Sequence, residues 1–281
     1  MTEHQTHADL LRWYAEMGVD CAIEETPQDR FAEAAQPEVR IAPPSETPPP
    51  PAPPPRPAST QPDRAPTRPV GDPLEAADTV EATGEAARAV ANAATTLDEL
   101  RTALEAFEGC ALKTTATQVV FADGNPGARL MLIGEAPGRE EDLQGLPFVG
   151  RSGQLLDRML AAIGLDRTST YIANIVPWRP PGNRTPTPLE TAACRPFIDR
   201  QIELVAPDVL VCLGAAAAKE ILATTDGILR LRGRWRTAHI NGREVRTMAT
   251  LHPAYLLRQP GQKRLAWRDL LAIREALAEG G

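Results

Sequence analysis

The chain has 281 residues, of which 42% are hydrophobic and 24% are charged, and its formal net charge is −7. This composition is ordinary for a globular protein, and no stretch approaches the ~20 consecutive apolar residues of a membrane-spanning helix. The first 20 residues lack the apolar core of a secretory signal, and four cysteines are too few for a disulfide framework. We therefore expect a cytoplasmic protein that does not enter a membrane.

The charge is divided unevenly along the chain. Residues 1–105 hold 8 basic and 19 acidic side chains, whereas residues 106–281 hold 22 basic and 18 acidic ones. Within residues 226–268 there are 10 basic and 2 acidic residues. A basic C-terminal part is compatible with a polyanionic partner such as nucleic acid, and equally with a solvated arginine-rich face.

The N-terminal part is expected to contain little packed structure. Apolar residues in Ala8–Met17 favour a short amphipathic helix within residues 1–20. Fourteen of the 28 prolines lie between Pro43 and Pro73. Because proline lacks the amide donor, this composition predicts a disordered, acidic, Pro-rich linker over residues 21–74. A PxxP ligand for a protein partner is the alternative to a simple spacer.

Two helices are predicted next, in a helical lead-in over residues 75–109. The Ala-rich run Glu75–Ala94 favours the first, and Leu97–Phe107, capped by Thr96, favours the second.

From Thr117 onward, short apolar strands alternate with helices. The predicted strands are Gln118–Phe121, Ala128–Ile133, Tyr171–Val176, Asp208–Leu213 and Val245–Leu251. The predicted helices are Gly153–Ile163, Leu189–Val205, Ala215–Ala223 and Arg264–Ala278. Such alternation predicts an α/β fold with a doubly wound, mainly parallel central sheet flanked by helices, in which ligands bind beyond the carboxyl ends of the strands.

Four sequence features follow these strands. The loop Gly134–Gly138 (GEAPG) is rigid and exposes backbone amides, but it lacks the Lys-Ser/Thr of a triphosphate-binding loop. Phe148 stands between turn residues and can stack on a planar ring, although a core aromatic has the same pattern. Asn174 can pair with a nucleobase edge or cap a loop, and His252 stands at the carboxyl end of the last strand.

Together these motifs resemble the family 4 uracil-DNA glycosylases. The residues that carry the resemblance are Gly134-Glu135-Ala136-Pro137-Gly138 with Glu141, Leu146-Pro147-Phe148-Val149-Gly150, Asn174 with Arg179-Pro180-Pro181-Gly182-Asn183-Arg184, and His252-Pro253-Ala254-Tyr255-Leu256-Leu257-Arg258. The match begins near Cys110 and implies a catalytic domain over residues 110–281. The implied activity is hydrolysis of the N-glycosidic bond of uracil in DNA, as in base excision repair.

The resemblance also implies roles for individual residues. Phe148 would stack on the flipped base, Asn174 would pair with uracil O4 and N3–H, and His252 would stabilise charge on O2. Glu135 is the first candidate for the carboxylate that steadies the sugar and orients water, Glu141 is the second, and Asn183 is expected to hold Glu135. Gly134 and Ala136 would line the uracil site, and Ala136 replaces an Asp of family 1 relatives.

The resemblance implies DNA contacts as well. The residues expected at the DNA are Arg184, Arg232, Arg234, Leu256, Leu257 and Arg258, with Arg230 and Arg236 adding phosphate contacts. The expected partners are therefore uracil-containing DNA, with association to the nucleoid, and a protein partner for the Pro-rich arm. We expect a monomer.

The sequence departs from the family at the iron–sulfur cluster. Members of the family typically hold a [4Fe–4S] cluster with four cysteines; two of these match Cys110 and Cys194, but the other two fall on Phe107 and Trp178. Two thiolates cannot replace four ligands. We therefore predict that no cluster and no other cofactor is bound, with the aromatic side chains filling the space.

Four alternatives to this activity follow from the same residues. A glycosylase of the same superfamily could act on hypoxanthine or xanthine, and a non-catalytic DNA-damage binder could be tethered through its Pro-rich arm. A nucleotide-phosphate enzyme is disfavoured because the Gly134–Gly138 loop lacks the lysine of a phosphate-binding loop. A relative that bonds covalently to its product site is disfavoured because Arg179–Arg184 contains no histidine.

Overall fold

The computed structural model describes residues 73–279, which belong to one compact unit, Arg68–Gly281. The predicted helix over Ala8–Met17 lies outside the described residues. So does the predicted linker, except for its last two residues, which begin the first described helix.

A sheet of six strands forms the centre of this unit. The strands are β1 (Asp123–Gly124), β2 (Leu130–Gly134), β3 (Thr170–Asn174), β4 (Val209–Leu213), β5 (Trp235–Ile240) and β6 (Arg243–Thr250). Their order is β1-β3-β2-β4-β6-β5, in which β3, β2, β4 and β6 are parallel and the two edge strands are antiparallel to their neighbours. The predicted doubly wound, mainly parallel sheet is thus confirmed.

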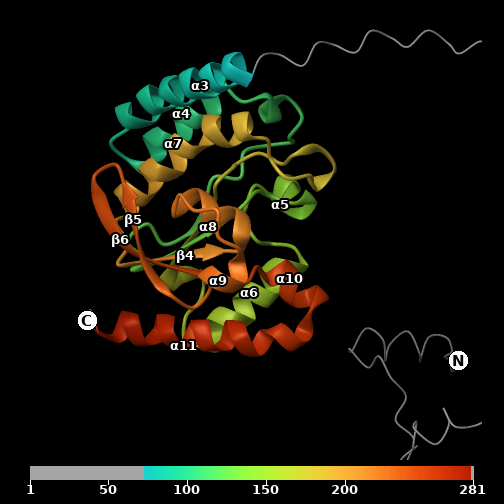
Figure 1. The fold of residues 1–281 in the computed structure, drawn as a ribbon, viewed down its shortest axis with the longest axis vertical. Helices are drawn as coiled ribbons and strands as arrows, with labels where there is room; N and C mark the ends of the chain where they lie inside the picture. Colours follow the sequence, from blue (N-terminus) through green and yellow to red (C-terminus); the bar gives the residue numbers. More distant parts are fainter. Residues whose placement is uncertain (1–72, 280–281) are drawn as a thin grey trace, which may run out of the picture. The chain divides into compact units, whose positions relative to one another are not determined.

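Helices cover both faces of the sheet (Figure 1). One layer contains α3 (Pro73–Ala93), α4 (Leu97–Ala106), α7 (Pro188–Val205) and α8 (Ala215–Ile221). The other contains α6 (Arg151–Ala161), α10 (Pro253–Arg258) and α11 (Lys263–Glu279). The remaining helices are the short α5 (Arg139–Gln144) and α9 (Ile228–Leu231) and four 3₁₀ turns, Ala111–Thr114, Arg167–Ser169, Pro181–Asn183 and Pro260–Gln262.

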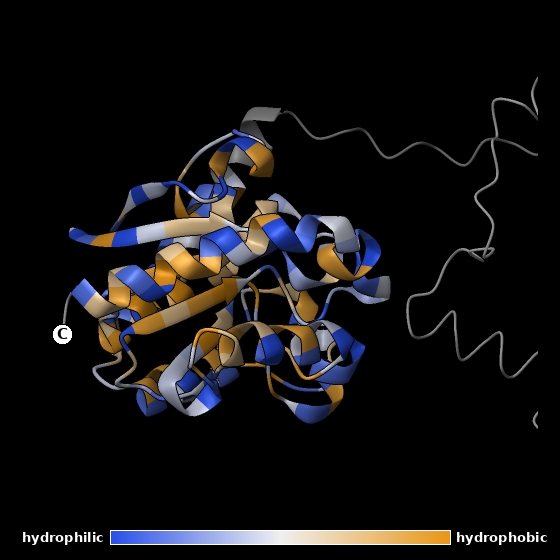
Figure 2. Cartoon of the chain, turned by 90° about the horizontal axis from the view of Figure 1, so that it is seen from below, coloured by the Kyte–Doolittle hydropathy of each residue, from blue (hydrophilic) through white to orange (hydrophobic). Residues whose placement is uncertain are grey.

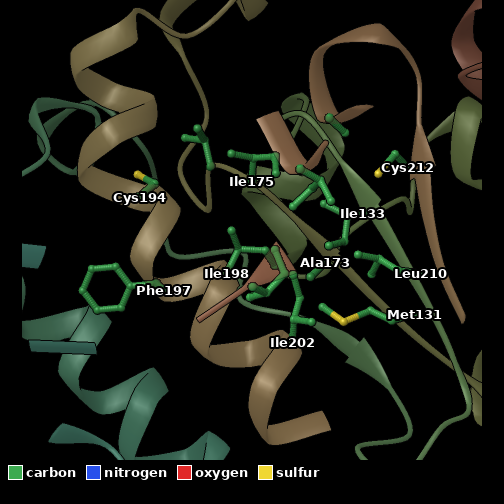
Figure 3. Packing of buried hydrophobic residues seen from close by; sticks show 14 of the residues in the cluster. Met131, Ile133, Ala173, Ile175, Cys194, Phe197, Ile198, Ile202, Leu210 and Cys212 are labelled. Atoms are coloured by element: carbon green, nitrogen blue, oxygen red, sulfur yellow. The ribbon is translucent and has the colours of Figure 1, made fainter. Parts of the chain in front are cut away.

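The central strands are buried on both faces, as their apolar runs predict. Successive side chains of a strand point to opposite faces, so Met131 and Ile133 pack toward α7 while Leu130 and Leu132 pack toward the other helical layer. Figure 3 shows Ile198 and Ile202 of α7 facing these strands. Figure 2 shows the same arrangement as hydrophobic colour on the strands and on the inner sides of the helices.

The helical lead-in belongs to the same hydrophobic core as the sheet. Ala87 and Ala91 of α3 are fully buried, and α3 packs along α7. Small side chains allow this close approach of two helices. Thr96 caps α4 as predicted, by accepting a hydrogen bond from the backbone N–H of Glu99 at 3.2 Å.

One strand prediction was wrong, and the two edge strands, β1 and β5, were not predicted. Gln118–Phe121 is not a strand; its one sheet-like bond runs from the Val120 N–H to the Pro177 carbonyl, at 2.8 Å. The edge strand β5 was not predicted, because half of its residues are exposed and it lacks an apolar run. None of the helices between residues 73 and 279 is long and apolar enough to cross a membrane.

Candidate active site

A cavity of about 840 Å³ opens at the carboxyl ends of the parallel strands. Loops that follow β2, β3, β4 and β6 form its walls, at the place where a doubly wound sheet binds its ligands. Predicted site residues in its lining are Glu135, Ala136, Glu141, Phe148, Asn174, Asn183, Arg184, His252 and Arg258. The four sequence features that follow the strands therefore meet in one cavity.

A narrow slot lies between Asn174 and Phe148, beside Gly134. A Cβ atom on Gly134 would lie 2.3 Å from Asn174 Oδ1 and 2.6 Å from Phe148 Cζ, closer than real Cβ contacts. Only glycine therefore allows the amide and the aromatic ring to lie this close to the end of β2.

The side chain of Asn174 carries an unpaired acceptor. Asn174 is only 4% exposed, and its Oδ1 has no hydrogen-bond partner. An unpaired buried acceptor costs roughly 1–3 kcal/mol. A ligand that presents an N–H group to Oδ1 would remove this cost, and the side-chain NH₂ can donate to an oxygen next to that N–H.

The ring of Phe148 forms the aromatic side of the slot. The ring of Phe148 is buried, and its centroid lies 5.6 Å from that of His252, with 32° between the ring planes. The φ of Phe148 is +55°, in the left-handed region. A flat apolar ring beside an unpaired amide suits a planar ligand with polar edges, such as a nucleobase.

His252 is held as a neutral imidazole. It caps the N-terminus of α10, and its Nδ1 accepts a hydrogen bond from the backbone N–H of Ala254 at 3.1 Å. Burial, assisted by the positive charge of Arg258, lowers the pKa of His252 to about 4. At neutral pH the ring proton is therefore on Nε2, which makes His252 a neutral donor.

Glu135 is the first candidate carboxylate, and it lines the same cavity as His252. Burial raises the pKa of Glu135 above its ordinary value, and a side-chain hydrogen bond with Thr185 acts in the opposite direction. Asn183, expected to hold Glu135, instead accepts a hydrogen bond from Arg179 Nε through its amide oxygen, at 2.7 Å. Thr185, a residue that the sequence motifs did not single out, thus takes the position expected for Asn183.

Glu141, the second candidate carboxylate, is bonded to the backbone. Its Oε1 accepts from the N–H groups of Val149 and Gly150 at 3.0 and 2.9 Å, and its Oε2 accepts from that of Gly138 at 3.1 Å. Both oxygens thus join the loop after β2 to the loop that precedes α6. This geometry suits a residue that fixes the cavity wall better than one that orients water.

The predicted DNA contacts fall into two groups. Leu257 is 38% exposed, and the predicted arginines other than Arg232 are also exposed: Arg184, Arg230, Arg234, Arg236 and Arg258. Arg184 forms a two-point ion pair with Glu190, at 2.6 and 2.8 Å. The other two predicted contacts point into the protein.

Arg232 and Leu256 have partners inside the fold. Arg232 binds the Asp269 carboxylate and donates to the Leu265 carbonyl at 2.7 Å, and Leu256 is 1% exposed in the core. These two side chains do not face the solvent. Their contacts fit a role in packing α11 and α10 rather than the DNA contact predicted for them.

The cysteine region does not fit an iron–sulfur cluster. Cys194 Sγ donates to Cys110 Sγ at 3.7 Å, and this lowers the pKa of Cys110. The Phe107 ring packs 5.1 Å from that of Phe197, and Trp178 is 2% exposed. Within residues 73–279 no three His, Cys, Asp or Glu side chains are grouped so as to hold a metal. Two thiols cannot provide four thiolate ligands, and both belong to the same hydrophobic cluster as Phe197 and Trp178.

Comparison with known proteins agrees with the fold and the cavity. A sequence model of the uracil-DNA glycosylase superfamily matches residues 121–271, more than half of the chain. The chain is 42% identical over 183 residues to a type-4 uracil-DNA glycosylase of Archaeoglobus fulgidus. The aligned region covers 64% of this chain and 92% of the relative.

Two further relatives agree. A type-4 uracil-DNA glycosylase of Thermotoga maritima is 41% identical over 181 residues, 61% of this chain and 90% of its own length. One of Sulfurisphaera tokodaii is 36% identical over 184 residues, 64% of this chain and 84% of its own. The chain therefore belongs to the type-4 uracil-DNA glycosylase family.

Proposed function

We propose that this protein hydrolyses the N-glycosidic bond of uracil in DNA, which leaves an abasic site for base excision repair. The observation that carries the proposal is the unpaired, buried Oδ1 of Asn174, a residue that lines the same cavity as Phe148 and His252. The three relatives described above are named type-4 uracil-DNA glycosylases, which supports the same substrate.

Recognition follows from the donors and acceptors of the slot. A base inside a duplex is out of reach, so the nucleotide must flip outward, at a cost of a few kcal/mol. Stacking of the flipped base on Phe148 returns about 1–3 kcal/mol. Asn174 then accepts from uracil N3–H through Oδ1 and donates to O4 through its NH₂ group. Cytosine presents an acceptor at N3 and a donor at N4, so both contacts would be mismatched.

Bond cleavage places negative charge on uracil and positive charge on the sugar. His252, neutral and protonated on Nε2, donates to uracil O2 as charge develops there. The carboxylate of Glu135, oriented by Thr185, stabilises the cationic sugar and positions the attacking water. No cofactor takes part in this hydrolysis.

The test uses a labelled oligonucleotide with one uracil. After incubation, alkali should cut the strand at the uracil position and nowhere else. Matched duplexes with thymine, cytosine, hypoxanthine or xanthine at that position define the specificity. Hypoxanthine is the informative competitor, because its N1–H and O6 repeat the donor and acceptor of uracil. If the hypoxanthine duplex is cleaved faster than the uracil duplex, hypoxanthine and not uracil is the preferred substrate. If the protein binds the duplexes but cleaves none of them, it is a damage-binding protein and not a glycosylase.

We also propose that the protein contains no iron–sulfur cluster, and that Phe107 and Trp178 pack where two cluster ligands stand in relatives. Each buried aromatic removes roughly 150–250 Å² from water, which stabilises the region without a metal. Anaerobically purified protein should contain no stoichiometric iron and no broad absorbance near 400 nm. About four irons per chain would contradict the proposal.

DNA phosphates are expected to bind the exposed arginines among the predicted DNA contacts, and this binding should weaken steeply with salt. Arg234→Gln should reduce the salt slope by about 1, as expected for one lost phosphate contact. Arg232→Gln is the matched comparison: because Arg232 binds Asp269, its loss should lower thermal stability and leave the slope unchanged. A monomeric state, association with the nucleoid and a protein partner for the Pro-rich arm remain predictions.

A further inference from the structure

The backbone of Phe148 has a conformation that an aromatic residue rarely adopts. Its φ of +55° lies in the left-handed region, where non-glycine residues are uncommon and where Asn, Asp and His, not phenylalanine, are enriched. A residue in such a region stays there only when its surroundings impose it, and such residues cluster at functional sites. The side chain in question is the aromatic wall of the cavity.

A single guanidinium group binds the backbone on both sides of Phe148. Arg167, at the start of a 3₁₀ turn before β3, donates from Nη1 to the Pro147 carbonyl at 3.0 Å and from Nη2 to the Phe148 carbonyl. These carbonyls belong to the two peptide groups that flank the Phe148 Cα. The orientations of those two groups define φ and ψ, so the contacts of Arg167 constrain both angles.

Two carboxylates fix the guanidinium in turn. Asp157 of α6 accepts from Arg167 Nε at 2.8 Å, and Asp123 of β1 accepts from Nη1 at 2.6 Å. Four of the five N–H donors of Arg167 are therefore engaged, in the planar arrangement that only arginine offers. Arg167 itself does not line the cavity formed by the described residues.

The Phe148 carbonyl also lies against α6. A Cβ atom on Gly153 would lie 1.6 Å from the Phe148 oxygen, so the helix and this carbonyl are in direct backbone contact. Gly153 and the guanidinium of Arg167 thus both contact this carbonyl.

We propose that Arg167 is a positioning residue for base recognition: it holds Phe148 in its left-handed conformation and thereby presents the ring to the flipped base. This inference rests on the proposed function, since it assigns to Phe148 the stacking role. It predicts that Arg167 influences excision through Phe148 and through nothing else.

The test is a double-mutant cycle on single-turnover excision of uracil, with Arg167→Met and Phe148→Ala. In the Phe148 background, Arg167→Met should slow excision about 10–100-fold, because small displacements of positioning groups cost about this much. In the Phe148→Ala background the same change should cost less than about 3-fold, because the ring it positions is gone. An equal loss in both backgrounds would overturn the proposal and indicate a general structural role.

A matched control has the same chemistry elsewhere in the fold. Arg200 donates from Nε and Nη2 to the Ala94 carbonyl at 3.0 and 2.8 Å, binds Glu203 and is 23% exposed, against 24% for Arg167. Arg200→Met should lower stability about as much as Arg167→Met and leave excision unchanged. If Arg167→Met does not fold, Arg167→Lys keeps the charge beside the carboxylates but cannot bind both carbonyls, and the same cycle applies.

Hydrogen exchange separates failure of this inference from failure of the proposed function. The amides of Val149 and Gly150, bonded to Glu141, should exchange at least about 10-fold faster in Arg167→Met and unchanged in Arg200→Met. If the wild-type protein excises no uracil, the proposed function fails, while faster exchange still supports the conformational role. Unchanged exchange in the Arg167 variant would refute that role whatever the substrate.

Discussion

The cavity and the cysteine region lie in the same fold but are built in opposite ways. The cavity keeps an unpaired amide oxygen at Asn174, a left-handed aromatic residue at Phe148 and a carboxylate with a raised pKa at Glu135. Around Cys110 and Cys194, by contrast, buried thiols meet packed aromatic rings.

This difference indicates where the protein retains unfavourable features. Unpaired polar atoms and strained backbone lower the stability of the free protein, and they persist where a ligand compensates for them. Apolar packing needs no ligand. Mutations in the cavity should therefore reduce activity more than stability, and mutations in the cysteine region should do the reverse.

The largest effect is expected from Asn174→Asp. An ionised carboxylate opposite uracil O4 replaces a donor with an acceptor, and mismatched buried polar groups discriminate by factors of 10⁴ or more in sites built for hydrogen bonding. We expect uracil excision to fall at least about 10³-fold, while binding to DNA with an abasic site changes less than about 3-fold. Cytosine excision should rise above the wild-type level, because the N4 group of cytosine can donate to the carboxylate.

Single-turnover excision rates of this variant on the uracil and cytosine duplexes test the prediction. Uracil excision at the wild-type rate would remove Asn174 from base recognition.

The next effect concerns pH. Because burial raises the pKa of Glu135 and lowers that of His252 to about 4, Glu135 should take up its proton first as the pH falls. Excision should therefore decline on the acid side through protonation of Glu135, while His252 is still neutral. Glu135→Gln should lower the plateau rate about 10²-fold and remove this decline above about pH 4.

His252→Ala gives the contrasting profile. It should lower single-turnover cleavage about 10²-fold, with DNA binding nearly unchanged, and retain the acid decline of the wild type. If His252→Ala removes the acid decline and Glu135→Gln does not, the decline comes from protonation of His252 and not of Glu135.

The sequence predicted the central fold because the parallel strands are apolar along their whole length. Leu130–Ile133 and Val209–Leu213 contain no polar residue, and only strands covered on both faces have that composition. The edge strand Trp235–Ile240 was missed, since its exposed positions are polar and its periodicity is weak. The motifs after the strands were placed correctly in one cavity, because the carboxyl ends of parallel strands meet at one edge.

Other properties of the site depend on side-chain direction, which a local motif does not contain. The alternation of arginines from Arg230 to Arg236 does not reveal that Arg232 turns inward to Asp269, 37 residues later. The contacts of Arg167 with Pro147 and Phe148 join segments about 20 residues apart and depend on a left-handed φ. Only the folded chain brings such groups together.

In the cysteine region the larger effect should come from Phe107→Ala. The Phe107 ring packs against Phe197 and over Gly109, where a Cβ atom would lie 2.2 Å from Phe107 Cζ. Truncation of a buried aromatic costs about 3–5 kcal/mol, and we expect about 2 kcal/mol here because Phe107 is half-buried. Urea unfolding should measure this loss, while uracil excision at 25 °C stays within about 2-fold of the wild type. A larger loss of excision than of stability would mean that the two regions are coupled.

The smallest effect is expected from Cys110→Ala. The change removes one sulfur and its hydrogen bond from Cys194, and should cost about 1 kcal/mol of unfolding free energy. If instead Cys110 were a ligand of a structural metal, its loss would release that metal and destabilise the domain far more. Urea unfolding and an iron assay of the variant beside the wild type distinguish these outcomes. We expect negligible iron in both proteins. We also expect a small shift of the unfolding midpoint, because a thiol that packs like a small apolar group can be replaced by alanine at little cost in stability.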